Sequence, residues 1–111
     1  MSNISVDVSM KGISAKEIKK ASDEAIETVL EMIGLQAEGY AIEICPVDTG
    51  RLRDSITHTV DGHSAVIGTN VEYASYVELG TSKREPHPYL APAIQNHLDE
   101  YKRMIEEGLK R

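Results

Sequence analysis

The sequence predicts a single α+β domain, in which a small antiparallel sheet, made from an N-terminal strand and a hairpin, packs against a long N-terminal helix and a C-terminal helix. Three patterns lead to this expectation. Residues 4–10 alternate apolar with polar side chains, residues from about 14 to 44 repeat apolar side chains at helical spacing, and an Asp-Gly pair divides two strand-like runs. A chain of 111 residues fits one domain, residues 1–111.

The first two elements have clear limits. Ile4, Val6 and Val8 alternate with serine and aspartate, as in a strand with one buried face. Ser14 and Glu17 have the spacing of a capping box, which predicts that the long helix begins there. Pro46 cannot continue the helical hydrogen bonds, so the helix must end just before it.

The predicted helix is too long for the domain that contains it. About 30 residues span ~45 Å, whereas a compact chain of this length has a diameter near ~34 Å. Either the helix bends near Gly34 or Gly39, or one end projects and needs a neighbour. Each glycine is either a tolerated surface position or a site of close helix–helix approach.

The Asp61-Gly62 pair predicts a hairpin with a two-residue loop. This loop would place Val60 opposite His63 and Ile56 opposite Ile67. The strand residues expected to face the core are Ile56, Val60, Ala65 and Ile67, with Thr57, Thr59 and Ser64 on the other face.

The C-terminal third predicts two more helices. A short helix covers residues 73–79 and ends at Gly80, and a loop follows over residues 81–88. A final helix runs from about Ala91 to Leu109, with Pro92 in its first turn, where proline is tolerated.

Composition and charge exclude several classes of function. The net charge of −6 argues against an independent nucleic-acid-binding protein, and no apolar run is long enough to cross a membrane. The start of the chain has no signal-peptide pattern. Cys45 is the single cysteine, so we interpret it as a small buried side chain and expect a reducing cytoplasm.

The tripeptide Asp48-Thr49-Gly50 raises the alternative of a homodimeric aspartic protease. Such enzymes need two Asp-Thr-Gly carboxylates that share a proton across a dimer axis. The protease tripeptide follows an apolar strand, whereas here it follows a helix that ends before Pro46. The structural interpretation, a turn capped by Asp and Thr side chains, is therefore favoured.

Four histidines raise the alternative of a metal site: His58, His63, His87 and His97. In the predicted hairpin His58 and His63 share one face as diagonal neighbours, about 7–8 Å apart. No carboxylate follows them at ligand spacing, so we predict neither a metal site nor a cofactor.

The long helix carries a concentration of negative charge. Its carboxylates either form an ordinary solvated face or line a channel that repels DNA, and the candidates for a lining are Glu24, Glu27, Glu31 and Glu38.

Four motifs, in a fixed order, resemble the tail-completion or head–tail joining proteins of long-tailed phages and prophages. They occupy residues 44–56, 66–74, 77–81 and 88–93, and the resemblance runs through roughly residues 14 to 105. The motif positions expected to hold the structure together are Pro46, Asp48, Thr49, Gly50, Leu52, Gly68, Tyr73, Ala74, Glu78, Gly80 and Pro88.

The resemblance implies a non-enzymatic virion protein that forms a ring, typically of six copies, at the upper end of the tail, after assembly in the host cytoplasm. Its implied partners are neck or connector proteins and tail-tube or tail-terminator proteins. A ring joins two different patches of one surface, and the long helix is one candidate. The other is the loop with Gly80, Thr81, Ser82, Lys83, Arg84 and Glu85. A free-standing binding module encoded by a prophage remains the alternative, and gene neighbourhood would separate the two.

Overall fold

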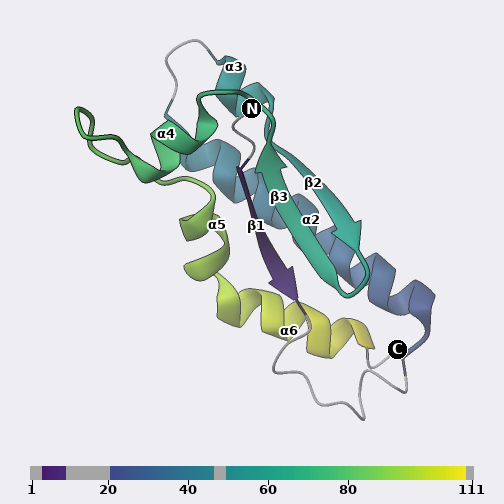
Figure 1. Ribbon diagram of the computed structural model, residues 1–111. Helices are drawn as coiled ribbons and strands as arrows, with labels where there is room; N and C mark the ends of the chain where they lie inside the picture. The colour runs from purple at the N-terminus through teal and green to yellow at the C-terminus, as the bar shows by residue number, and fades with distance from the viewer. Residues whose placement is uncertain (1–3, 10–20, 47–49, 110–111) are drawn as a thin grey trace.

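A computed structural model of the chain describes residues 4–9, 21–46 and 50–109 (Figure 1). The elements follow the order β1 (Ile4–Ser9), α2 (Asp23–Ile44), α3 (Arg51–Asp54), β2 (Thr57–Asp61), β3 (Ser64–Thr69), α4 (Ala74–Leu79), α5 (Ala91–Gln95) and α6 (Leu98–Leu109). The predicted α+β class is confirmed.

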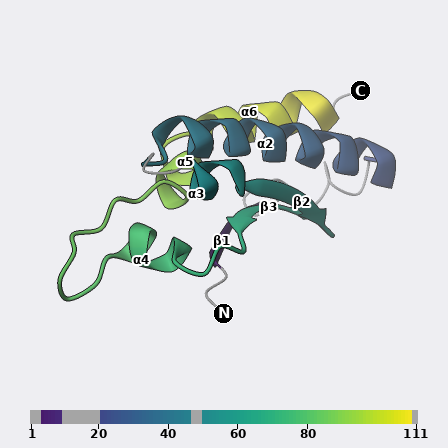
Figure 2. The same cartoon turned by 90° about the horizontal axis from the view of Figure 1, so that it is seen from above.

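The three strands form one antiparallel sheet in the order β1-β3-β2. The helices α2 and α6 lie side by side over one face of this sheet, as Figure 2 shows. Along β3, buried residues alternate with half-buried ones because successive side chains point to opposite faces. The core therefore lies between the sheet and the two helices.

Aliphatic and tyrosine side chains fill this core. Leu30 and Ile33 of α2 and Tyr89 are fully buried, and Tyr101 of α6 is 1% exposed. Cys45 is buried as well, and burial raises the pKa of its thiol. The interpretation of Cys45 as a small buried side chain is thus confirmed.

The long helix is shorter than the sequence predicted. Ser22 has an extended backbone, and its side-chain oxygen accepts a hydrogen bond from the N–H of Ala25 at 3.1 Å, so α2 begins at Asp23. The predicted capping box of Ser14 and Glu17 lies outside the described residues. The prediction of one continuous helix from residue 14 is wrong, because Ser22 interrupts it. The 22 residues of α2 span about 33 Å.

The hairpin forms, but its turn lies one residue further along the chain than predicted, so each residue of β2 pairs with a residue two positions later than expected. Val60 lies opposite Ala65 and His58 lies opposite Ile67. The loop is Gly62-His63, and Gly62 alone has a positive φ, +59°, as at the first central residue of a type II′ turn. The predicted faces are retained, because a shift of two residues in the pairing keeps every side chain on its own side of the sheet.

The predicted C-terminal helix is divided in two. The chain turns at Asn96 and His97 between α5 and α6. The His97 ring stacks on Tyr40 of α2 with 3.6 Å between ring centroids, and the Tyr40 hydroxyl donates to Glu100 at 2.7 Å. These contacts fix α6 against α2. The apolar spacing of Ile94, Tyr101 and Ile105 continues across the turn. The sequence therefore shows no sign of the break between α5 and α6.

The two helical glycines have different surroundings. A β-carbon on Gly34 would lie 2.7 Å from Cδ2 of His58, so β2 approaches the helix closely there. A β-carbon on Gly39 would meet nothing within 4 Å. Gly34 is thus a site of close approach, but by a strand and not by the predicted second helix, and Gly39 is a tolerated surface position.

Alanine substitutions at these two glycines should change stability in opposite directions. Gly39→Ala should raise the free energy of unfolding by up to about 1 kcal/mol, because alanine favours helix. Gly34→Ala should lower it by about 1–3 kcal/mol, because the new methyl group displaces the His58 ring. Urea denaturation of the matched pair checks both. A stabilising Gly34→Ala would contradict the described packing.

Candidate functional site

Glu78 joins α4 to the start of α5. Its side chain is buried, and its two carboxylate oxygens accept hydrogen bonds from the backbone N–H groups of Tyr89, Leu90 and Ala91, at 2.9, 2.8 and 3.1 Å. N–H groups at a helix start have no partner inside the helix, so the carboxylate satisfies them. Two motifs of the resemblance, residues 77–81 and 88–93, meet at this contact.

The loop after α4 has a defined backbone path. Gly80 has φ +75° and ψ 176°, a conformation open to glycine alone. The N–H of Thr81 donates to the carbonyl of Arg84 at 2.9 Å, and the N–H of His87 donates to the carbonyl of Val77 at 2.8 Å. The side chains of residues 81–88 are all exposed. We refer to α4 and this loop, residues 74–88, as the arm.

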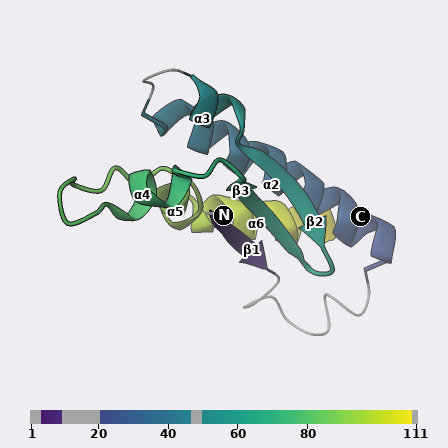
Figure 3. The same ribbon diagram turned by 45° about the horizontal axis from the view of Figure 1, so that its top comes forward.

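The arm extends from the body of the molecule, as Figure 1 and Figure 3 show. Two large apolar side chains of α4 are exposed on it, Tyr76 at 54% and Leu79 at 71%. The candidate interface residues from Thr81 to Glu85 lie at its tip, next to one another in the tight turn. The structure therefore presents the predicted loop as one projecting surface.

The connector that follows α2, residues 46–53, runs into α3 and contains both buried and ion-paired residues. Gly50 has a positive φ, +82°, and Leu52 is buried. Arg51 donates two hydrogen bonds of 2.9 Å to the Glu72 carboxylate, which holds the pKa of Glu72 below its usual value. The Arg51 guanidinium also lies 5.6 Å from the centre of the Tyr73 ring.

The structure also shows where the other predicted motif residues lie. Pro46 is exposed at the end of α2, Ala74 is fully buried at the start of α4, and Gly68 pairs with both outer strands. Asp48 and Thr49 lie outside the described residues. Gly50 leads into a helix, so the tripeptide lies between two helices instead of following a strand as in the proteases.

His58 is held between two carboxylates whose positions no spacing in the sequence predicts. Its Nε2 lies 2.6 Å from Oε1 of Glu31, and its Nδ1 lies 3.0 Å from Oε1 of Glu38. This contact clamps β2 to α2 beside Gly34. His58 and His63 are not the diagonal strand neighbours that the sequence predicted, because His63 lies in the turn. Among residues 4–9, 21–46 and 50–109, no group of three acidic, histidine or cysteine side chains could hold a metal ion.

The His58 contact predicts a dependence of stability on pH. The hydrogen bond with Glu38 raises the pKa of His58 above its ordinary 6.5; burial opposes this rise and Glu31 adds to it. The stabilisation is therefore complete below about pH 6.5 and is lost as the pH rises through the folded-state pKa. His58→Gln should remove this loss, and His63→Gln, in the exposed turn, should retain it. Parallel pH profiles of unfolding for the parent and His58→Gln would contradict the clamp.

The outward face of α2 is both apolar and acidic. Met32 is 57% exposed and Leu35 is 60% exposed, and they share one shallow depression with Glu24, Glu27 and Glu31. No lysine or arginine occurs between residues 23 and 44. Of the four carboxylates considered for a channel lining, Glu31 and Glu38 bond to His58, and Glu24 and Glu27 are exposed.

No helix in the described part of the chain is both long enough and apolar enough to cross a membrane. The comparisons with curated proteins and with solved structures gave no match. A protein-family model described as "Bacteriophage HK97-gp10, putative tail-component" matches residues 14–80. This match spans α2, the connector, the hairpin and α4, and ends two residues after Glu78. The chain therefore belongs to the HK97 gp10-like family of phage tail components.

Proposed function

We propose that this tail component is a structural, non-catalytic protein that forms a ring at the top of the phage tail and joins the tail tube to the head or neck. Family membership supports a place in the tail. The order of the four motifs, which resembles that of tail-completion proteins, supports the joining role. In this proposal six copies contact one another, a neck or connector protein, and a tail-tube or tail-terminator protein.

One observation carries the proposal: among the exposed apolar side chains of the described residues, two pairs lie on different elements and form patches that do not overlap. Tyr76 and Leu79 form one on the arm, and Met32 and Leu35 form the other on α2. A ring is closed by a heterologous interface, in which one patch of each copy meets a different patch of the next. The elongated shape, 49 × 22 × 19 Å, keeps two such patches apart.

The carboxylates that the structure brings together support a structural role over a catalytic one. Glu78 accepts three backbone hydrogen bonds, and Glu31 and Glu38 bond to His58. Each group thus has partners that the fold requires. The charge of −6 per copy also suits a protein beside passing DNA, since a basic surface would bind phosphates and slow the movement.

Mass spectrometry of purified phage particles tests this proposal. The chain should be present in a few copies per particle, because a ring at one position needs one set of subunits. A major capsid protein and a host cytoplasmic protein provide upper and lower references for the copy number. Absence of the chain from mature particles would contradict the proposed function.

A further inference from the structure

We propose that the arm of one copy docks on the outward face of α2 in the next copy, with Leu79 and Tyr76 against Met32 and Leu35, and Lys83 near the α2 carboxylates. This inference rests on the proposed ring, because it names the two surfaces that would close it.

The arm has the character of a docking surface. Leu79 is 71% exposed at the end of α4, and Tyr76 is 54% exposed one helical turn before it. Neighbouring exposed apolar side chains on one projecting element are typical of an interaction site. Lys83 extends this surface with a positive charge at the exposed tip of the loop.

The arm is also preorganised. Glu78 anchors α4 to the start of α5, Gly80 supplies the sharp change of direction, and the bond from His87 to Val77 returns the loop to the helix. A surface that is already ordered loses little conformational entropy on binding, which favours association.

The outward face of α2 complements the arm. Thr28, Met32, Leu35 and Gly39 are exposed and follow the spacing of one helical face. Small side chains at Thr28 and Gly39 leave room for an incoming apolar side chain on either side of Met32 and Leu35. Glu24 and Glu27 border this strip, and with no cation on α2 they favour a positively charged partner such as Lys83.

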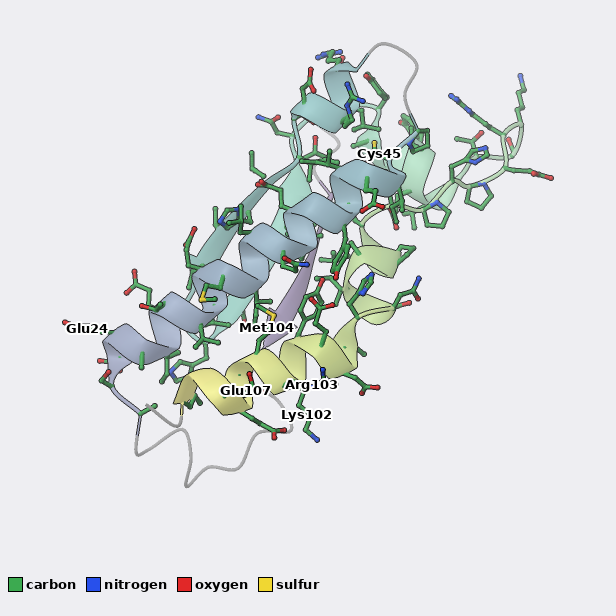
Figure 4. All side chains as sticks on the ribbon, turned by 180° about the vertical axis from the view of Figure 1, so that it is seen from behind. Glu24, Cys45, Lys102, Arg103, Met104 and Glu107 are labelled. Carbon is green, nitrogen blue, oxygen red and sulfur yellow. The ribbon has the colours of Figure 1, made fainter. Side chains whose placement is uncertain are left out.

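One molecule can use both surfaces at once. In Figure 4 α2 runs from near Glu24 at one end to near Cys45 at the other, and the arm leaves the body near the Cys45 end. The arm of a copy is thus directed away from most of its own α2. A second copy of the chain is the occupant that meets both the apolar and the charge requirement with residues already described.

The same face could instead line the DNA channel, and the apolar side chains decide between these uses. A channel wall facing water and phosphate gains nothing from Met32 and Leu35, which are more than half exposed. Covering them with Leu79 and Tyr76 removes apolar surface from water, and this stabilises the joint.

Cross-linking in assembled particles tests the docking. Thr28 and Ser82 are exposed on the two surfaces, so a Thr28→Cys, Ser82→Cys double variant treated with a bis-maleimide should give a ladder of covalent multimers. The parent, whose Cys45 is buried, is the control and should give none. Each single variant should stop at one chain or at a dimer.

The outcomes separate this inference from the proposed function. Particles that contain the double variant but yield no ladder would overturn the docking and leave the ring in place. If particles of the parent phage do not contain the chain, the proposed function itself is overturned.

Charge reversal gives an independent readout. Glu27→Lys should reduce incorporation of the chain into particles several-fold, and adding Lys83→Glu to it should restore incorporation. Lys102→Glu, an exposed residue of α6, is the matched control and should change nothing. Normal incorporation of Glu27→Lys with slow, salt-dependent DNA ejection would mean that this face lines the channel, and would contradict the docking.

Discussion

Glu78→Ala should lower the free energy of unfolding by about 3 kcal/mol or more. The substitution leaves three backbone N–H groups at the start of α5 without an acceptor, and each buried unsatisfied donor costs about 1–3 kcal/mol. A domain of this size has a total stability of only about 5–15 kcal/mol. The melting temperature should therefore fall by more than ~10 °C.

Two further variants serve as controls for the loss of stability expected in Glu78→Ala. Glu78→Gln keeps an oxygen that can accept from Tyr89 and Leu90 but turns an amide toward the N–H of Ala91, so its loss should be smaller than that of alanine. Glu85→Ala removes an exposed carboxylate from the same arm and should stay within about 0.5 kcal/mol of the parent. If Glu78→Ala cost no more than Glu85→Ala, the described anchor would be wrong.

Gly80→Ala should be the second strongly destabilising change. The backbone at Gly80 is strained for any residue with a β-carbon, at about 1–3 kcal/mol. In addition, that β-carbon would lie 2.8 Å from the nitrogen of Pro86 and 2.9 Å from the carbonyl oxygen of Arg84, both backbone atoms. Because backbone cannot move aside cheaply, the loop must leave its path.

Gly62→Ala is the matched control for Gly80→Ala. Gly62 also has a positive φ, but a β-carbon there would meet nothing within 4 Å, so only the backbone strain remains. The two variants therefore separate steric overlap from backbone conformation. Amide exchange supplies the local readout: the His87 N–H, bonded to Val77 in the parent, should exchange much faster in Gly80→Ala. Unchanged protection of His87 would contradict the close approach at Gly80.

The sequence predicted the parts of the fold that depend on periodicity and on proline. Alternation predicted the strands and their core face, and Pro46 predicted the end of α2 at Ile44. The sequence did not determine the register of the hairpin, because Asp61-Gly62 and Gly62-His63 can both form the turn and these two turns lie one residue apart. The break at Asn96 and His97 was also hidden, since it depends on the stacking of His97 on Tyr40, 57 positions earlier in the chain.

The candidate site shows the same limit. The motif pattern identified Glu78 and Gly80 as structurally important, but only the three-dimensional arrangement reveals that Glu78 caps α5 and that Gly80 lies against Pro86. The bonds of His58 to Glu31 and Glu38 join residues 27 and 20 positions apart, across two elements. No local spacing rule connects such residues. The one sequence feature that pointed to this contact was Gly34, whose missing side chain leaves room for the His58 ring.

The most direct test of the central claim is electron microscopy of a lysate from a phage that lacks this chain. If the chain joins the tail to the head, the lysate should contain DNA-filled heads and finished tails that are separate, and infectivity should return when the chain is supplied from a plasmid. Joined, infectious particles in its absence would contradict the account.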